Sequence, residues 1–568
     1  MIALPPIGRG ADFGEGKKMF GEKIMETEKL LGLTVSSMTK VYADAETLAE
    51  ETENSMLSDE RFHFQLALKN VSGDVLRRVR AECLGDLREA VTLRLVKNVP
   101  CIMAAPQSAD DYYERTAPGL FPDVLQPWDG KDLVLSPGYW QSVWVTVNGK
   151  GGLPAGKHEI VLRVSGLNGE TLGEYRYALE VRPSKLAEND LIVTHWMHYD
   201  GIAARHGVEL FSEAFYEVFG RYLDVYTGCG NTMLLTPLFT PPLDTEPGGE
   251  RRTAQLVGVK AAEGKYSFDF SALDFFMDFA AARGIRYFEF SHLFTQWGGE
   301  YCPKIMAERD GKTERIFGWE TRADSAEYAK FLEAFLPALT AFVRGKGLED
   351  RCFVHLTDEP GAQHIGQYLR CRDAVKKHIG GMRTMDALSD YEFYEKGGVD
   401  MPAVATPHAG SFLEKGVKQM LIYYCCWPGS GYYSNGFLAM PSQRNRILGI
   451  QLYLSGVKGF LHWGFNFYNS GLSLFELNPY EDTNGGGFFP GGDAFMVYPY
   501  EKGAAASLRC EVFYDGIQDY LALKALERKE GREYVLGLLR EEGVEGLNVY
   551  PRSAEWHRGF RRKINAAL

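Results

Sequence analysis

The chain has 568 residues, which is too long for one compact core, and ordinary domain sizes predict two to four folding units. Its 45% hydrophobic and 24% charged residues are typical of a globular protein and exclude wholesale disorder. The formal net charge of -13 argues against a nucleic-acid partner, and no segment reaches the roughly 18 apolar residues that a membrane span requires.

The N-terminus and the cysteines predict a cytoplasmic protein. No apolar segment of a secretory signal follows the first few residues. The nine cysteines include the neighbours Cys425 and Cys426, which do not resemble a secreted disulfide framework, so we expect reduced and buried thiols. We expect no metal or other cofactor, because the chain has no Cys-x-x-Cys motif and His195 and His198 should point to opposite faces of a strand.

The first third of the chain predicts an all-β unit behind a leader. Residues 1–57 form a leader of unclear structure. Between 58 and 184, short alternating runs end at turn signals, as in 143–147 before Asn148-Gly149 and 160–164 before Asn168-Gly169. These runs predict an antiparallel β-sandwich, and Arg182-Pro183-Ser184 marks its end.

Residues 185–515 change rhythm to short apolar runs separated by helical patterns, which predicts parallel strands with crossover helices. The helix expected over Ala326–Arg344 is one such crossover. Eight strands suit a (β/α)8 TIM-like barrel; an open doubly wound sheet is the alternative, but no glycine-rich phosphate loop follows any strand. Residues 516–568 predict a helical tail packed on the barrel, so the fold class is multidomain α/β plus all-β. The expected strands are Leu191–Trp196, Thr232–Thr236, Tyr287–Ser291, Cys352–Thr357, Arg383–Ala387, Ala403–Thr406, Met420–Cys425 and Gly459–Trp463.

The strongest chemical signal is a pair of carboxylates, Asp358 and Glu359, directly after the fourth expected strand and before Pro360. Barrel enzymes carry their chemistry where strands end. Two like charges this close raise the pKa of at least one carboxyl, which keeps a proton available for general acid catalysis. The alternative is a helix N-terminus that carries acids because the helix dipole favours them.

The spacing of the pair restricts the mechanism. A retaining glycosidase usually places two carboxyls on opposite sides of the scissile bond, roughly 5 Å apart. Adjacent residues approach from one side, and the seventh expected strand runs into Cys426-Trp427-Pro428 without a carboxylate. A 2-acetamido group of the substrate could supply the missing nucleophile, with one acid orienting the amide and the other protonating the leaving oxygen.

Six short stretches follow one another in a recognisable order: Thr236-Pro237-Leu238-Phe239-Thr240-Pro241-Pro242, Phe268-Asp269-Phe270, Gly284-Ile285, Phe317-Gly318-Trp319, Asp358-Glu359-Pro360 and Asp515-Gly516-Ile517-Gln518-Asp519-Tyr520. Through these stretches the chain resembles, from about Leu191 onward, glycoside hydrolase family 123 and the related barrel proteins with the domain of unknown function 4091. This resemblance implies a sandwich before a barrel and β-N-acetylgalactosaminidase activity with substrate assistance. It implies Asp358 as the acetamido-orienting residue and Glu359 as the general acid/base.

Polar and aromatic residues at the other strand ends are candidate sugar contacts. Trp427 and Trp463 are candidate stacking platforms, and Tyr424 is a candidate donor to the acetamido oxygen; core packing is the alternative for each. Asp386 and Asn466 could bind ring hydroxyls or cap local turns. The full set of substrate-binding candidates is Trp196, His198, Asn231, Glu289, His292, Asp386, His408, Tyr424, Trp427, Trp463 and Asn466.

The expected function is therefore exo-acting removal of β-linked N-acetylgalactosamine from an N-acetylhexosamine-containing glycan, with net retention. One alternative is a glycosidase of other specificity that pairs Glu359 with Glu289 or Asp386. A second alternative is a non-catalytic carbohydrate-binding protein.

Overall fold

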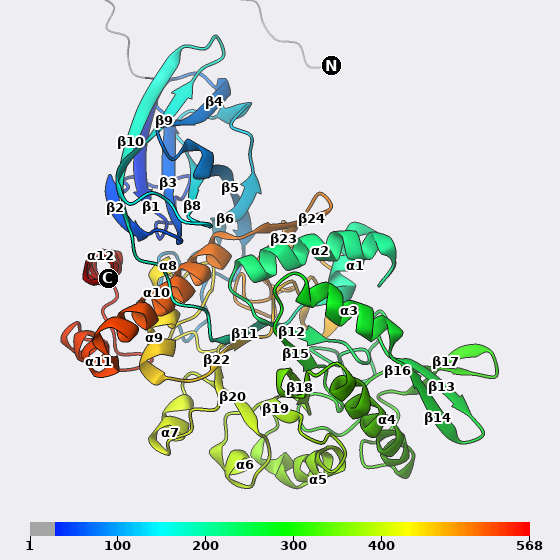
Figure 1. The fold of residues 1–568 in the computed structure, drawn as a ribbon. Coiled ribbons are helices and arrows are strands. Elements are labelled where there is room, and N and C mark those ends of the chain that lie inside the picture. The colour runs from blue at the N-terminus through cyan, green and yellow to red at the C-terminus, as the bar shows by residue number, and fades with distance from the viewer. Residues whose placement is uncertain (1–28) are drawn as a thin grey trace, which may run out of the picture.

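Two five-stranded sheets pack face to face at one end of the molecule (Figure 1), which a computed structural model describes over residues 29–568. Alternate side chains from both sheets, such as Phe64 and Leu66 facing Tyr177 and Leu179, fill the space between them. One sheet has the order β1-β3-β8-β5-β6, with β1 (Leu30–Ser36), β3 (Arg61–Asn70), β8 (Trp140–Asn148), β5 (Val91–Cys101) and β6 (Gly119–Pro127). The other has the order β2-β10-β9-β4-β7, with β2 (Glu53–Leu57), β10 (Thr171–Arg182), β9 (Gly156–Ser165), β4 (Leu76–Leu84) and β7 (Leu133–Leu135).

Two strands of this sandwich come from the residues that the sequence analysis treats as a leader. β1 pairs antiparallel with β3, and β2 pairs parallel with β10 at the far end of the sandwich sequence. β2 has five residues and its partner is remote in sequence, so local alternation gave no signal for it. Residues 1–28 of the expected leader lie outside the described part of the chain.

The barrel is an eight-stranded parallel sheet in which every expected strand is present. Its order is β11-β22-β21-β20-β19-β18-β15-β12, and the two end strands meet where the Thr232 N–H donates to Val193 O at 2.9 Å. Leu235, Met385 and Leu421 pack inside it. The strands are β11 (Ile192–His195), β12 (Met233–Thr236), β15 (Tyr287–Phe290), β18 (Cys352–His355), β19 (Arg383–Ala387), β20 (Met401–Ala405), β21 (Leu421–Tyr423) and β22 (Gly459–His462).

Helices surround the barrel, and a small sheet projects from it (Figure 1). That sheet, ordered β14-β13-β16-β17, is inserted into the connections after β12 and β15 and was not predicted. Its strands are β13 (Gly258–Ala262), β14 (Lys265–Asp269), β16 (Ile305–Arg309) and β17 (Lys312–Phe317), and β23 (Val497–Tyr500) with β24 (Gly503–Ala506) forms a separate hairpin. The helices are α1 (Tyr199–His206), α2 (Glu213–Gly228), α3 (Ser271–Ala281), α4 (Ala326–Gly345), α5 (Ile365–Lys376), α6 (Tyr391–Glu395), α7 (Ala409–Glu414), α8 (Ser442–Arg446), α9 (Leu448–Ser455), α10 (Leu508–Glu530), α11 (Arg532–Glu541) and α12 (Ala554–Ala567).

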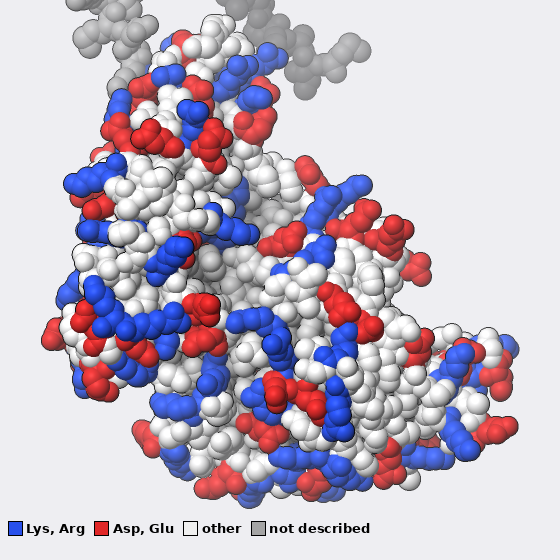
Figure 2. All heavy atoms as spheres, viewed as in Figure 1, with Lys and Arg blue, Asp and Glu red and all other residues white. Residues whose placement is uncertain are grey.

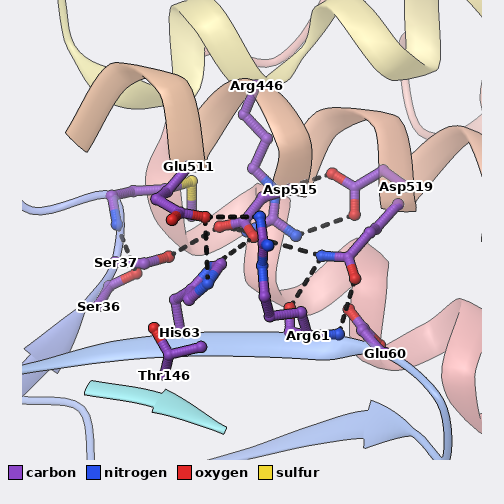
Figure 3. Close-up of polar contacts among 12 residues, drawn as sticks. Ser36, Ser37, Glu60, Arg61, His63, Thr146, Arg446, Glu511, Asp515 and Asp519 are labelled. Atoms are coloured by element: carbon purple, nitrogen blue, oxygen red, sulfur yellow. Dashed lines mark hydrogen bonds and ion pairs between the residues drawn. The ribbon is translucent and has the colours of Figure 1, made fainter. Parts of the chain in front are cut away.

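Helix α10 lies between the sandwich and the barrel (Figure 1), and it begins at Leu508, before the expected start of the tail at Gly516. Glu511, Asp515 and Asp519 recur every four residues and so lie on one face of α10. They meet basic side chains from both neighbours (Figure 3): Arg61 of β3 in the sandwich and Arg446 of α8 beside the barrel.

The polar contacts at this junction join partly buried arginines to the buried acids of α10 (Figure 3). Arg61 Nη2 lies 2.7 Å from Glu511 Oε2, His63 Nδ1 lies 2.8 Å from Asp515 Oδ1, and Arg446 Nε lies 2.7 Å from Asp519 Oδ2. Removing one partner of a buried pair leaves an uncompensated charge, which costs about 3–5 kcal/mol. The junction therefore holds the sandwich in a defined orientation on the barrel.

The cysteine prediction is wrong for two residues and incomplete for two others. Cys229, which follows α2, forms a disulfide with Cys510 of α10, 281 residues later. No local spacing signals a pair so distant in sequence. Cys426 is exposed and Cys425 is half-buried, so neither is a fully buried thiol.

The surface and helix lengths show ordinary features. On the face drawn in Figure 2, Lys and Arg side chains are interspersed with Asp and Glu, so that face carries mixed charge rather than a patch of one sign. Within residues 29–568, every helix is too short or too polar to cross a bilayer.

Candidate active site

A pocket of about 240 Å³ opens at the carboxyl ends of the barrel strands. This is the end where barrel enzymes place their active sites. Four of the predicted site residues line it: Trp196, Asp358, Glu359 and Trp463. The other lining residues are Leu243, Asp244, Gln296, Trp297, Ala387, Tyr423, Cys425, Cys426, Leu461 and Phe489.

The turn that carries Asp358 and Glu359 is fixed through its backbone. The Trp297 N–H donates to Asp358 O at 2.8 Å, and the Glu359 N–H donates to Ala387 O at 3.0 Å. Glu359 has φ 44°, a left-handed conformation that costs a residue with a side chain about 1–3 kcal/mol. The neighbouring strands thus hold Glu359 in a strained conformation that directs its side chain.

Tyr423, at the end of β21, contacts the Glu359 side chain. Its Oη donates to Glu359 Oε1 at 2.5 Å. Burial, followed by the charge of Glu359, raises the pKa of Tyr423 well above its usual value, so the phenol keeps its proton and remains a donor. The hydroxyl therefore orients the carboxylate that the sequence analysis assigns as general acid/base.

Asp358 lies deeper in the pocket than Glu359. Burial, and then the charge of Glu359, raises the pKa of Asp358 well above its usual value. Asp386 and Asp244 act in the same direction, whereas His355 opposes them. Asp358 thus retains a proton at a pH where an ordinary aspartate would lose it.

A layer of buried polar residues lies beneath the pocket. His355 is fully buried between two carboxylates, with Nδ1 2.7 Å from Glu289 Oε1 and Nε2 3.5 Å from Asp386 Oδ1. Trp196 Nε1 donates to the same Glu289 oxygen at 2.9 Å, and Thr357 donates to Asp386 Oδ2 through N at 3.0 Å and Oγ1 at 2.9 Å. This chain of contacts joins the pocket wall to the residue before Asp358.

His355 and His292 are stacked with ring centroids 3.8 Å apart, yet their pKa values shift in opposite directions. Burial alone would lower the pKa of His355, but Asp386 and Glu289 raise it to about 10. Burial, and then the charge of His355, lowers the pKa of His292 well below its usual value. A ring nitrogen of each histidine and a carboxylate oxygen of Asp358 lie within 4.8 Å of one another.

Trp463 forms an aromatic wall of the pocket. Its Nε1 donates to Asp493 Oδ2 at 3.0 Å, and its ring lies 4.9 Å from that of Phe489 and 5.0 Å from that of Phe467. The hydrogen bond fixes the orientation of the indole. A sugar entering the pocket would meet a fixed aromatic surface.

Several predicted contacts lie outside the pocket. Tyr424 points to the outer face of its strand, where its Oη donates to Asn445 at 3.3 Å. Asn231 precedes β12 instead of following it, so it lies at the opposite end of the strand and contacts His195. His198 and Asn466 are buried and bond each other, since Asn466 Oδ1 accepts from the His198 N–H and Nδ2 donates to His198 O, both at 2.9 Å.

Two groups of predicted residues remain close to the pocket without lining it. Glu289, His292 and Asp386 belong to the buried layer below. His408 and Trp427 are exposed, with ring centroids 5.6 Å apart, on the loops after β20 and β21.

Long loops supply lining residues that the strand pattern did not predict. Asp244 follows the Pro241-Pro242 segment after β12, and its pKa is raised to about 6 by burial. Gln296 and Trp297 come from the loop after β15, and Phe489 comes from the loop after β22. Tyr423 could have been found from the alternation of side chains along its strand, because it shares the inward face with Leu421 two residues earlier.

The chain is similar to known proteins in both sequence and fold. The sequence matches glycoside hydrolase 123, catalytic domain, over residues 196–526, which is more than half of the chain. No curated protein matches. The fold is similar to that of a family 123 glycoside hydrolase from Clostridium perfringens, studied for glycolipid glycan hydrolysis, with a TM-score of 0.73, 16% identity, and coverage of 95% of this chain and 97% of the other.

Weaker likenesses concern other glycosidases. A glycosyl hydrolase family 2 member from Bacteroides cellulosilyticus has 12% identity and a TM-score of 0.28, with coverage of 77% of this chain and 45% of the other. The Parabacteroides merdae β-glucuronidase has 10% identity and a TM-score of 0.31, with coverage of 86% and 52%. Scores this low carry no argument. The family match over the barrel and the fold shared with a member of the same family show that the chain belongs to glycoside hydrolase family 123 and is a glycosidase.

Proposed function

We propose that this glycosidase removes a terminal β-linked N-acetylgalactosamine with net retention, using the acetamido group of the substrate as the nucleophile. Asp358 accepts a hydrogen bond from the amide N–H and orients its carbonyl oxygen toward the anomeric carbon. Glu359 protonates the leaving oxygen and then activates the water that opens the cyclic intermediate. The galacto configuration rests on the resemblance to the family.

The observation that carries this proposal is the distribution of carboxylates around the pocket. Asp358 and Glu359 leave from one turn, and the strand end at β21 supplies Tyr423 instead of an acid. Glu289 and Asp386, the alternative partners for Glu359, are 0% exposed and bonded to His355, Trp196 and Thr357. Neither can reach a sugar, which favours a nucleophile supplied by the substrate.

The environment of the two neighbouring acids supports their division of labour. An amide N–H donated to Asp358 favours its charged form, against the burial that raises its pKa. Tyr423 donates to Glu359 Oε1 and so fixes the orientation of the acid that would protonate the leaving oxygen.

The pocket size supports a single terminal sugar. Its volume of about 240 Å³ is below the roughly 300–1,000 Å³ of pockets that enclose drug-sized ligands. Trp196 and Trp463 offer apolar surfaces for the C–H faces of one ring. The similar enzyme studied for glycolipid glycan hydrolysis suggests a glycan as the natural substrate.

One second candidate has a specific observation in its favour. Asp244 lines the pocket from a different loop, so a two-carboxylate glycosidase would have to use Asp244 opposite Glu359. Such an enzyme would have no need of an acetamido group.

A panel of 4-nitrophenyl β-glycosides distinguishes these functions, with the product anomer followed by NMR at early times. The proposal expects turnover of the 2-acetamido galactoside, release of the β-anomer first, and little turnover of the parent galactoside. Equal turnover of the two galactosides would refute substrate assistance. Turnover of none of the sugars would favour a binding protein.

A further inference from the structure

The charged histidine below the pocket has a position that the proposed reaction does not yet use. His355 lies three residues before Asp358 and is enclosed by Glu289 from β15 and Asp386 from β19. All three side chains are 0% exposed. A buried charge of this kind is costly unless it is paired, and retention of three ionisable groups here calls for a role.

We propose that His355 is a positioning residue, a buried imidazolium that stabilises the charged form of Asp358 and fixes the turn that carries it. This inference rests on the proposed function, because a charged Asp358 matters when positive charge develops on the acetamido group during attack.

Several ionisable groups face Asp358 and act on its pKa. The carboxyls of Glu359, Asp386 and Asp244 favour a proton on Asp358, as does burial. His355 is the positive group among the causes that shift the pKa of Asp358. A ring nitrogen of His355 lies within 4.8 Å of an Asp358 carboxylate oxygen. His292 also lies within that distance but is neutral. Replacing the imidazolium with a neutral group would therefore leave Asp358 protonated to a higher pH.

The positioning part follows from the hydrogen bonds. The two ends of the His355 ring face carboxylates that are themselves anchored: Glu289 by the Trp196 indole and Asp386 by the backbone N–H and hydroxyl of Thr357. Thr357 directly precedes Asp358. The chain of contacts therefore links the wall on which a sugar would rest to the backbone of the acid that would orient its amide.

The protonation state can be measured without a substrate. Nitrogen chemical shifts in protein labelled with ¹⁵N-histidine, assigned by loss of one signal in His355→Gln, should show an imidazolium that does not titrate between pH 6 and pH 9. A neutral His355 in this range would overturn the inference, whatever the enzyme cleaves.

The consequence for catalysis is a shift in the pH dependence of kcat/KM, on its acid limb. His355→Gln should move this limb upward by about one to three pH units, the effect of an opposite charge at this range. The matched control is His292→Phe, which removes an equally buried imidazole without a charge and should leave the limb in place. Equal shifts in both variants would assign the effect to packing and overturn the proposal.

If His355→Gln does not fold, two other variants still test the inference. Asp386→Asn and Glu289→Gln each retain the side-chain shape, and each should lower the pH at which the His355 signal titrates. If neither variant changes that titration, the two carboxylates do not hold the proton on His355 and the inference is contradicted. Turnover of sugars without an acetamido group would instead defeat the proposed function while leaving the imidazolium signal unchanged.

Discussion

Replacing Tyr423 with Phe tests how Glu359 is oriented. The substitution keeps the ring and removes only the hydroxyl that donates to Glu359 Oε1 at 2.5 Å. A hydrogen bond to a charged group contributes about 1.5–3 kcal/mol, and 1.4 kcal/mol is a factor of ten. If the bond acts mainly in the transition state, kcat/KM for the 4-nitrophenyl 2-acetamido galactoside should fall roughly 10- to 150-fold, with most of the loss in kcat.

The neighbouring tyrosine provides a matched control. Tyr424→Phe removes a hydroxyl that donates to Asn445 at 3.3 Å on the outer face of the same strand. We expect it to leave kcat/KM unchanged and to cost about 1 kcal/mol of stability, measured by urea denaturation. The reasoning is refuted if Tyr423→Phe retains wild-type kcat/KM, or if both variants lose activity to the same extent.

Three further predictions concern other residues. Glu359→Gln should lower kcat/KM about 10²- to 10⁴-fold for a poor leaving group and much less for 2,4-dinitrophenolate, and equal losses for both would remove Glu359 as the general acid. Arg509 Nη2 is buried and lies 2.9 Å from Asp123 Oδ2, so Asp123→Asn removes the charged partner of this guanidinium. The variant should lose about 3–5 kcal/mol of stability in chemical denaturation, and a cost below about 1 kcal/mol would contradict the role of this pair. The pKa of Asp244 is raised to about 6, so its contribution to stability is present below about pH 4 and is lost as the pH rises through 6. Asp244→Asn should therefore stabilise the protein by about 3 kcal/mol more at pH 8 than at pH 4. An equal change in Tm at both pH values would be inconsistent with this.

The barrel strands could be predicted because each is a short apolar run between helical patterns. β19, for example, runs from Arg383 to Ala387 as expected. The pair Asp358 and Glu359 was visible because it directly follows such a strand. The family match confirms the resemblance that these motifs indicated, with the match beginning at residue 196.

What the sequence did not reveal depends on contacts between distant segments. β2 was missed because its partner is β10, and the Cys229–Cys510 disulfide joins residues 281 positions apart. Loop residues such as Asp244 reach the pocket only through the path of their loop.

The choice of Tyr424 failed for a simpler reason. Successive residues of a strand face opposite sides, so an error of one residue exchanges the pocket for the outer packing layer. Leu421 and Tyr423 lie in the inner cluster, whereas Ile422 and Tyr424 lie in the outer one. Fixing the parity from Leu421 would have identified Tyr423.

The central claim is that the acetamido oxygen of the substrate attacks the anomeric carbon. The most direct test compares kcat/KM for 4-nitrophenyl galactosides carrying N-acetyl, N-fluoroacetyl, N-difluoroacetyl and N-trifluoroacetyl groups, which differ little in size but progressively weaken the carbonyl oxygen as a nucleophile. We predict a steep, continuous fall in rate along the series. A rate that does not change with fluorine content would show that the amide is not the nucleophile and would contradict the account.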